Sequence, residues 1–206
     1  MPVVWESTQP ELPANGTIAP GIYYLKANLG TGMFARVKYP LSNEQRQKLE
    51  ARSRRWLAAR PGLDRGEWWY NTFEPKIFME CSVSGDEDSI SWNFYVLNGQ
   101  IPMIGLFTKH HDGSKSSTWL NVNFQPLLEQ STLPQVTNFT IKELHHQMRE
   151  LAQKIGSTFS SVRVDFLEGR DDKIYLCELT FSPGDGMTKR PHEVDTLLTT
   201  PWTALR

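Results

Sequence analysis

The chain has 206 residues, of which 39% are hydrophobic and 22% are charged, and its formal net charge is -1 at pH 7. This length suffices to bury a hydrophobic core without disulfides or metals, and the balanced charge argues against nucleic acid or an anionic membrane surface as the default partner. The two cysteines, Cys81 and Cys177, lie far apart in sequence, so no disulfide framework or zinc motif is expected. Both are predicted to be small buried hydrophobic residues.

The N-terminal sequence MPVVWESTQPELPANG lacks the basic and apolar regions of a signal peptide. No stretch approaches the roughly 18 apolar residues that a membrane span needs. We therefore expect a soluble, cytoplasmic protein with no membrane insertion.

The first half of the chain predicts a small lobe. Residues 1–20 contain four prolines and no clear periodicity, which predicts an irregular lead-in. Strands are predicted over 21–27 and 33–40, joined by a glycine-rich turn, and a further strand over 75–83. Between them, Ser42 followed by Gln45 resembles a capping box and predicts a helix over 43–60, whose inner side carries Leu49, Trp56 and Leu57.

The second half predicts another lobe. Residues 89–110 are typical of two strands joined by an Asn-Gly turn, and residues 111–134 are polar and loop-like. Apolar residues at helical spacing then predict a helix over 138–155, with Gly156 just after its end. A final hairpin follows over 161–186, and the order of elements favours an α+β fold of two lobes, each built on antiparallel strands.

The final hairpin, SVRVDFLEGRDDKIYLCELTFSPGDG, carries charges where a hairpin is expected to bury side chains. With a turn centred on its Arg-Asp pair, Arg163 is predicted to lie opposite Glu178, and Asp165 opposite Leu176. Period-two alternation then places four polar residues on one face: Arg163, Asp165, Glu178 and Thr180.

Two interpretations of this polar face are open from the residues alone. Arg163 and Glu178 form a structural ion pair in the first. In the second, Asp165 and Glu178 supply oxygen ligands to Mg²⁺ while Arg163 contacts a phosphate.

A glycine-rich turn, Gly30-Thr31-Gly32, follows Lys26 on the first hairpin. Such a turn lets backbone N–H groups approach phosphate oxygens, and a lysine on the adjoining strand adds a point charge. The sequence lacks the GxxxxGK[ST] pattern of a Walker loop, and a G-x-G turn alone is typical of an ordinary hairpin.

Taken in order, the segments YYLKANLGTGM, EPKIFMECSV, RVDFLEG and YLCELTFSPG resemble the motif series of the ATP-grasp superfamily. The nearest resemblance is to its TupA-like branch, which is found with polysaccharide and peptide-conjugate biosynthesis. It runs over roughly residues 20–195, and its specificity lies in the ordered set of motifs. The resemblance implies a two-lobed α+β ATP-grasp core with an ATP cleft between the lobes. Residues 1–20 would be the lead-in, 21–80 the lid and 81–206 the lower subdomain with the metal-binding hairpin.

The resemblance also implies roles for residues of the lid and the hinge. Lys26 would contact the α- and β-phosphates under the loop formed by Gly30, Thr31 and Gly32. Glu80 to Val83 would form the hinge, where backbone groups of Cys81 and Val83 hydrogen-bond adenine. Glu87 would bind the ribose hydroxyls, with the neighbouring Asp86 or Asp88, or no residue of this acidic loop, as the alternatives. Lys109 would be a further cation on the phosphates, and Lys76 would face ATP, with a solvated lysine as the alternative for both.

In the lower subdomain, the resemblance implies that Asp165, Glu178 and Thr180 hold Mg²⁺ and that Arg163 stabilises the transferring phosphoryl group. Thr180 stands where the family usually has asparagine, so a second Mg²⁺ would be held less firmly. Cys81 stands where the hinge often carries lysine. The N-terminal domain that usually precedes the lid is largely absent, so a partner protein or a homo-oligomer is expected to replace it in substrate binding.

The activity implied is an ATP- and Mg²⁺-dependent ligation of a carboxylate and an amine through an acyl phosphate. Two alternatives remain: a kinase that phosphorylates a hydroxyl, and a non-catalytic ATP-binding module that works with a partner enzyme. The sequence also contains two histidine pairs. His145-His146 is predicted to lie on a polar helix face, and His110-His111, beside Lys109, is a candidate for substrate contact.

Overall fold

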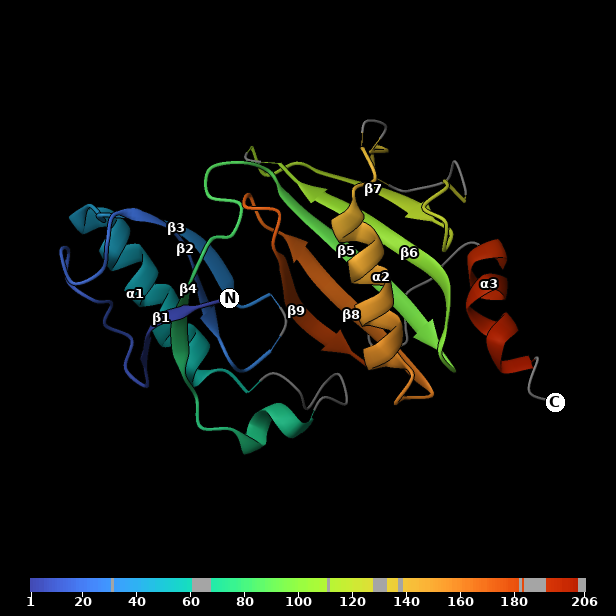
Figure 1. Ribbon diagram of the computed structural model, residues 1–206. Coiled ribbons are helices and arrows are strands. Elements are labelled where there is room, and N and C mark those ends of the chain that lie inside the picture. Colours follow the sequence, from blue (N-terminus) through green and yellow to red (C-terminus); the bar gives the residue numbers. More distant parts are fainter. Residues whose placement is uncertain are drawn as a thin grey trace. The chain divides into compact units, whose positions relative to one another are not determined.

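The structure is a computed structural model that describes residues 1–30, 32–60, 68–110, 112–127, 133–136, 139–181, 183 and 192–203. The side chains of residues 68, 69, 193 and 201–203 lie outside this description. The chain divides into two compact units, Met1–Gly85 and Asp86–Arg206, each built on one antiparallel sheet (Figure 1). The predicted α+β fold is therefore confirmed.

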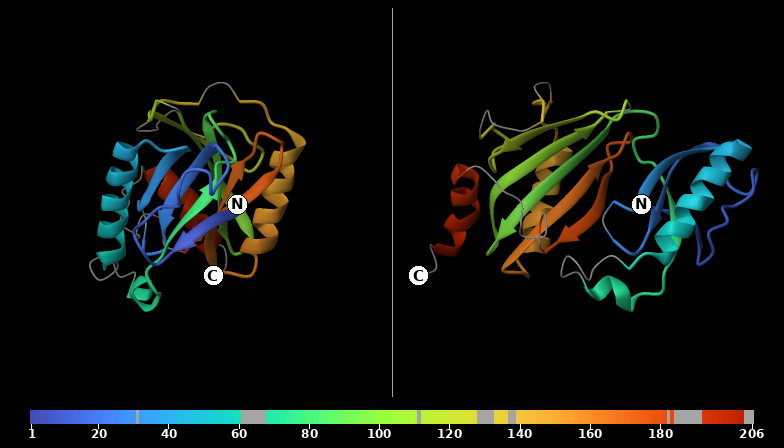
Figure 2. Two further views of the ribbon diagram at one scale, coloured as in Figure 1. Left: turned by 90° about the vertical axis from the view of Figure 1, so that its left-hand side faces the viewer. Right: turned by 180° about the vertical axis from the view of Figure 1, so that it is seen from behind.

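The first unit contains a four-stranded sheet in the order β1-β4-β2-β3. Its strands are β1 (Val3–Ser7), β2 (Gly21–Ala27), β3 (Phe34–Tyr39) and β4 (Ile77–Cys81), and a 3-10 helix, η1 (Trp68–Thr72), precedes β4. Helix α1 (Asn43–Ala58) lies along one face of this sheet (Figure 2). Alternate side chains of the strands point towards α1 and form the core of this unit. They include Leu25, Val37, Ile77 and Met79.

Helix α1 begins at the predicted capping box. The hydroxyl of Ser42 accepts a hydrogen bond from the backbone N–H of Gln45 (3.2 Å), and the Gln45 side chain accepts one from the N–H of Ser42 (2.9 Å). Trp56 is buried, and Leu49 and Leu57 pack against the same core, as predicted. The expected stop at Pro61-Gly62 lies outside the described residues.

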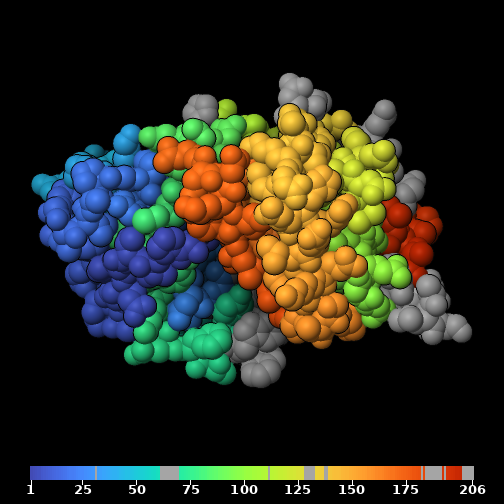
Figure 3. Space-filling view, viewed as in Figure 1, coloured from blue at the N-terminus to red at the C-terminus, as the bar shows by residue number. Residues whose placement is uncertain are grey.

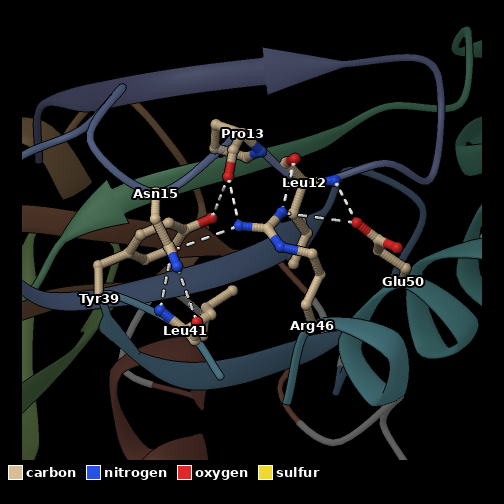
Figure 4. Close-up of polar contacts among 7 residues, drawn as sticks. All are labelled: Leu12, Pro13, Asn15, Tyr39, Leu41, Arg46 and Glu50. Atoms are coloured by element: carbon tan, nitrogen blue, oxygen red, sulfur yellow. Dashed lines mark hydrogen bonds and ion pairs between the residues drawn. The ribbon is translucent and has the colours of Figure 1, made fainter. Parts of the chain in front are cut away.

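The expectation that residues 1–20 form an irregular lead-in is wrong in part, because β1 pairs antiparallel with β4. The segment after β1 is irregular but firmly attached (Figure 4). Arg46 on α1 donates hydrogen bonds to the carbonyls of Leu12 and Pro13, both at 2.9 Å, and Glu50 accepts one from the N–H of Leu12 at 3.1 Å. These contacts join residues more than 30 positions apart, so no local pattern could have indicated them.

Two more contacts complete this attachment. The amide of Asn15 exchanges two hydrogen bonds with the backbone of Leu41, at 2.8 and 2.9 Å. The hydroxyl of Tyr39 donates to the carbonyl of Pro13 at 3.2 Å. The lead-in is therefore part of the first unit's structure.

We expect Arg46→Ala to lower the free energy of unfolding by about 2 kcal/mol, because two partly buried carbonyls lose charged hydrogen-bond donors. Urea unfolding at pH 7 measures this change. Arg54→Ala removes an exposed arginine from the same helix and should change stability by less than about 0.5 kcal/mol. Equal stability of the two variants would contradict the role given to Arg46.

The second unit contains a five-stranded sheet in the order β7-β6-β5-β8-β9. The strands are β5 (Ser89–Leu97), β6 (Gln100–Lys109), β7 (Lys115–Leu120), β8 (Ser161–Glu168) and β9 (Ile174–Thr180). The predicted Asn-Gly turn joins β5 and β6, with positive φ angles of 48° at Asn98 and 75° at Gly99. Strand β7 lies in the segment expected to be a loop. Its sequence, KSSTWL, is polar, and pairing with β6 rather than apolar content brings it into the sheet.

Helices cover the two faces of this sheet (Figures 1 and 2). Helix α2 (Glu143–Gly156) packs on one face through Leu144, Met148 and Ala152, as its predicted apolar stripe requires, and hides the centre of the sheet in the space-filling view (Figure 3). Helix α3 (His192–Thr203), which the sequence analysis missed, packs on the other face through Val194 and Leu198. Within the described ranges, no helix is both long and apolar enough to cross a membrane.

Gly156 is the last residue of α2 rather than the position after its end. A Cβ atom at this position would lie 2.5 Å from the Cβ of Val96 on β5. Close packing of the helix on the sheet, and not a left-handed cap, therefore explains this glycine.

His145 does not lie on a polar helix face, as expected, but is 1% exposed. Its Nδ1 accepts a hydrogen bond from the backbone N–H of Lys142 (2.9 Å), so its Nε2 carries the proton that it shares with Glu168 on β8 (3.2 Å). Glu168 also accepts hydrogen bonds from Lys142 (3.0 Å) and from the indole of Trp92 (3.4 Å). This cluster fastens α2 to the sheet.

The hydrogen bond from His145, opposed by burial and assisted by Lys142, lowers the pKa of Glu168 to about 2 from its ordinary value of 4.5. A lowered pKa in the folded state means that the carboxylate stabilises the fold above its unfolded-state pKa, here by about 3 kcal/mol. This stabilisation is lost as the pH falls from about 4.5 through about 2.

We therefore expect Glu168→Gln to lower the free energy of unfolding by about 2 to 3 kcal/mol at pH 7, with a smaller difference from the wild type at pH 3. Urea unfolding at several pH values measures both effects. Glu150→Gln removes an exposed carboxylate from α2 and serves as the control. A difference that stays constant from pH 7 to pH 3 would exclude the ionised carboxylate as its cause.

Candidate metal and nucleotide site

The β8–β9 hairpin pairs two residues away from the predicted register. Arg163 lies opposite Thr180, and Asp165 lies opposite Glu178 rather than Leu176. The prediction of the pairs was wrong, but the shift is an even number, so all four polar residues still share one face.

Two features cause the difference in register. The turn is wider than expected, since Glu168 pairs with Ile174, and β9 contains a bulge between the partners of Asp165 and Phe166. The extra residue of this bulge is Cys177. Its side chain is exposed and that of Cys81 is half-buried, so the prediction that both cysteines are buried was wrong. Without the extra residue, Glu178 would lie opposite Val164, which faces α2 and is fully buried.

An ion pair occupies the centre of this polar face. The Nε of Arg163 donates to Asp165 Oδ1 at 2.8 Å, and Nη2 donates to Oδ2 at 2.6 Å and to the hydroxyl of Thr180 at 3.1 Å. Thr180 in turn donates to Glu178 at 2.9 Å. Arg163 and Asp165 are 18% and 8% exposed in their side chains, so the predicted partnership of Arg163 with Glu178 is replaced by a bidentate one with Asp165.

The charges in this cluster act against burial. Burial raises the pKa of Asp165, the hydrogen bonds and charge of Arg163 lower it, and the charge of Glu178 raises it, with a net pKa above the ordinary value. Burial lowers the pKa of Arg163, but Asp165 more than offsets this and raises it overall. An additional cation nearby would therefore stabilise the ionised form of Asp165.

The neighbouring strand β5 adds two residues that the sequence analysis missed. Asn93 pairs with Asp165, and Tyr95 pairs with Arg163, whose guanidinium lies 6.0 Å from the centre of the Tyr95 ring. Two rows therefore cross three strands on one face, namely Asn93–Asp165–Glu178 and Tyr95–Arg163–Thr180. The alternation of Ser91, Asn93 and Tyr95 with apolar residues was the available signal.

The oxygen atoms of this face fit a hard divalent cation. Mg²⁺ prefers oxygen ligands and is usually held by one or two carboxylates together with waters and phosphates. In the part of the chain that the structure describes, no group of three or more His, Cys, Asp or Glu side chains could hold an ion. Asp165 and Glu178 would therefore need neutral oxygens beside them, and Thr180 is one of these.

In the first unit, two predicted residues lie together. Lys26 on β2 forms an ion pair with Glu80 on β4 at 2.5 Å, and their side chains are 27% and 13% exposed. Lys76 lies 3.5 Å from Glu6. All four side chains project from the face of the sheet opposite α1, where Arg36 also lies.

The predicted hinge begins where β4 ends. The backbone N–H of Cys81 donates to the carbonyl of Pro2 (3.2 Å), which leaves Val83 as the neighbouring candidate donor for adenine. Arg36, another residue that the sequence analysis missed, donates to the carbonyl of Gly85 (3.2 Å). Glu87 is exposed in the turn that follows.

The glycine-rich turn connects β2 and β3, as predicted. Gly32 has a φ of 83°, a conformation that favours glycine, and the N–H of Ala27 donates to the carbonyl of Met33 across the turn at 2.9 Å. Gly30 lies in the same turn, and Thr31 lies outside the described residues.

Lys109 shares the face of Asn93, since it pairs with Ser89 on the same strand. It lines a hollow of about 280 Å³ together with Lys115, its partner on β7, and Phe107. His110 does not accompany it. That imidazole lies on the α2 face, between Asp88 (2.6 Å) and Ser116 (3.0 Å), and His111 lies outside the described residues.

The larger cavity, of about 610 Å³, opens on the α2 face. It is lined by His110, His145 and Glu168, and by none of the residues predicted to bind the nucleotide or the metal. The size of this cavity would favour it as a ligand site. Its polar residues Glu168 and His145, however, use their hydrogen-bonding groups to attach α2 to the sheet. We therefore assign the candidate site to the face of Asp165.

Comparison with protein families decides the identity. The family model described as TupA-like ATPgrasp matches residues 65–201, which is more than half of the chain and includes both carboxylates. The chain belongs to the TupA-like ATP-grasp family. No curated protein matches it in sequence.

Several solved structures resemble this TupA-like ATP-grasp chain at low identity. An L-amino acid ligase from Bacillus licheniformis is 15% identical with a TM-score of 0.40, and the match covers 80% of this chain and 35% of that one. D-alanyl-alanine synthetase A from Vibrio cholerae is 16% identical with a TM-score of 0.41, covering 89% and 53%. The chain thus spans about half or less of these structures. Scores of this size carry no argument, and the assignment depends on the family model.

We expect Arg163→Met to lower the free energy of unfolding by about 3 kcal/mol at pH 8, because it leaves the Asp165 carboxylate buried beside Glu178 without a cation. The pKa of Asp165 would rise further, and a raised pKa in the folded state means that stability falls as the pH rises through it. The loss should therefore be smaller at pH 5.

Urea unfolding of the metal-free protein at both pH values tests this expectation. Arg170→Met, an exposed position in the turn of the same hairpin, is the matched control and should resemble the wild type at both pH values. If Arg163→Met is as stable as this control at pH 8, the ion pair contributes nothing to the fold.

Proposed function

We propose that this protein is an ATP- and Mg²⁺-dependent ligase that joins a carboxylate to an amine. One observation carries the proposal: in a member of the TupA-like ATP-grasp family, Asp165 and Glu178 lie opposite each other on a single sheet face, with Arg163 beside them. Two carboxylates so close together repel each other, and a bound cation would remove that repulsion.

Asp165 and Glu178 would hold the metal, with Thr180 as a neutral oxygen ligand next to them. ATP would be a substrate, and the bound metal would make its γ-phosphorus more electrophilic. The substrate carboxylate would attack this phosphorus to give an acyl phosphate and ADP, and an amine would then attack the acyl carbon, lose a proton and release phosphate. Chemistry of this type depends mainly on positioning and on electrostatic stabilisation.

Arg163 would have two roles at this site. Its guanidinium holds both oxygens of Asp165 and so orients this carboxylate. Guanidinium N–H groups would also contact the transferring phosphoryl oxygens. The charge of Arg163 would be most valuable in the transition state.

Lys26 in the first unit would contact the phosphates, with Glu80 holding its ammonium group in place. Gly30, Thr31 and Gly32 would close over them. Further nucleotide contacts would come from the following residues: Lys76, Val83, Glu87 and Lys109. In this proposal the lid comprises residues 21–80 and the lower subdomain residues 81–206. The first compact unit of the structure ends slightly later in the chain, at Gly85.

The substrate is proposed to belong to cell-surface polysaccharide or peptide-conjugate biosynthesis, in the cytoplasm. The resemblance to the TupA-like branch supports this pathway. A partner protein or a second copy of the chain would help to bind the carboxylate.

The decisive experiment measures ADP release with Mg·ATP and a panel of carboxylates, each with and without amines. We expect release to require both substrates and to fall at least about a hundredfold in Glu178→Gln, because the metal loses a charged ligand. Glu150→Gln, the exposed control, should keep the wild-type rate. Mg·ATP at about a hundred times its Kd should also stabilise the wild-type fold by about 2.7 kcal/mol.

Other outcomes would identify the alternatives. ADP release that requires a hydroxyl compound and no amine would indicate a kinase. Thermal stabilisation by Mg·ATP without turnover on any substrate would indicate a non-catalytic module. The absence of any Mg·ATP-dependent change in Tm would overturn the proposal.

A further inference from the structure

Asn93 is a buried polar residue in the middle strand of the second unit's sheet. It is 9% exposed and lies on β5, between β6 and β8. Burying an amide costs free energy unless it is hydrogen-bonded or serves another purpose. The reason for an amide at this position is therefore to be found on the face that it shares with Asp165.

The register places Asn93 in direct line with both carboxylates. Asn93 pairs with Asp165, which pairs with Glu178 on the next strand. Side chains of directly paired residues have Cβ atoms about 4.5 to 5.5 Å apart. The amide of Asn93 is thus the nearest cross-strand neighbour of Asp165 on the side away from Glu178.

Ser91 determines how this amide is oriented. Its hydroxyl donates a hydrogen bond to Asn93 Oδ1 at 2.5 Å. A carbonyl oxygen has two lone pairs, so this bond fixes the amide and leaves one lone pair for another partner. Amide oxygens are among the ligands that Mg²⁺ and Ca²⁺ accept.

The other neutral oxygen beside the two carboxylates, the hydroxyl of Thr180, also has hydrogen-bond partners. Thr180 accepts a hydrogen bond from Arg163 and donates its hydroxyl proton to Glu178. Its oxygen keeps one lone pair, as the Asn93 oxygen does, but a hydroxyl is a weaker neutral ligand than an amide carbonyl. The polar face of Asp165 therefore offers two neutral ligands of unequal strength, and the stronger one lies on β5.

We propose that the amide oxygen of Asn93 is a third protein ligand of the divalent cation held by Asp165 and Glu178, and that Ser91 positions it. This inference rests on the proposed function, because it concerns the same metal. It gives β5 a direct role in metal binding, in addition to the β8–β9 hairpin.

The test measures Mn²⁺ affinity of the full chain by electron paramagnetic resonance of free Mn²⁺, with and without ADP. Asn93→Ala and the similarly shaped Asn93→Leu should each weaken Mn²⁺ binding about tenfold, as loss of a supporting ligand commonly does. Ser91→Ala should weaken it less, because the amide stays but is no longer oriented. Asn123→Ala, an exposed asparagine, should bind Mn²⁺ as the wild type does.

The outcomes separate this inference from the proposed function. If Glu178→Gln weakens Mn²⁺ binding but both Asn93 variants bind like the wild type, the inference is overturned and the metal site stands. If neither Glu178→Gln nor the Asn93 variants change the affinity, the metal site itself fails. Circular dichroism and Tm of each metal-free variant check folding, and a lower Tm with unchanged affinity would reduce Asn93 to a structural residue.

Discussion

Cys177, the extra residue of the bulge in β9, determines which side chains face Asp165. Strands alternate with a period of two, so one inserted residue exchanges the two faces of everything beyond it. Here the insertion keeps Leu179 against the core beside α2 and turns Glu178 towards Asp165. The positions of Glu178 and Thr180 beside Asp165 and Arg163 depend on this single irregularity.

The two faces of this sheet treat their buried carboxylates differently. On the α2 face, Glu168 receives hydrogen bonds from three side chains, and its pKa falls to about 2. On the opposite face, Asp165 has Arg163 as a cation but Glu178 as a neighbour, and its pKa is raised. The first carboxylate is satisfied by the fold and gives it stability. The ionised form of Asp165 would be stabilised by further positive charge, and a carboxylate with such a raised pKa is typical of a functional site.

Local patterns predicted the elements that local physics determines. The capping box at Ser42, the Asn98-Gly99 turn and the apolar stripe of α2 each depend on residues a few positions apart, and each was found. The polar face of the final hairpin was also predicted, because alternation survives an even shift in register. Strand β7 and the attachment of residues 1–20 were not, since pairing and side-chain contacts with distant residues create them. Asn93 was missed for the same reason: only pairing with β8 brings it to Asp165.

Strand β1 determines which strand forms one edge of the first unit's sheet. It occupies the outer edge of β4, whose backbone would otherwise offer a row of unpaired N–H and C=O groups. Exposed edges of this kind recruit strands from other molecules and promote aggregation. The contacts of Arg46, Glu50 and Asn15 keep the chain after β1 in place and so hold β1 along β4. The first fifteen residues thus move the open edge of the sheet from β4 to β1, whose irregular pairing between Val3 and Trp5 makes it a poorer template for strands of other molecules.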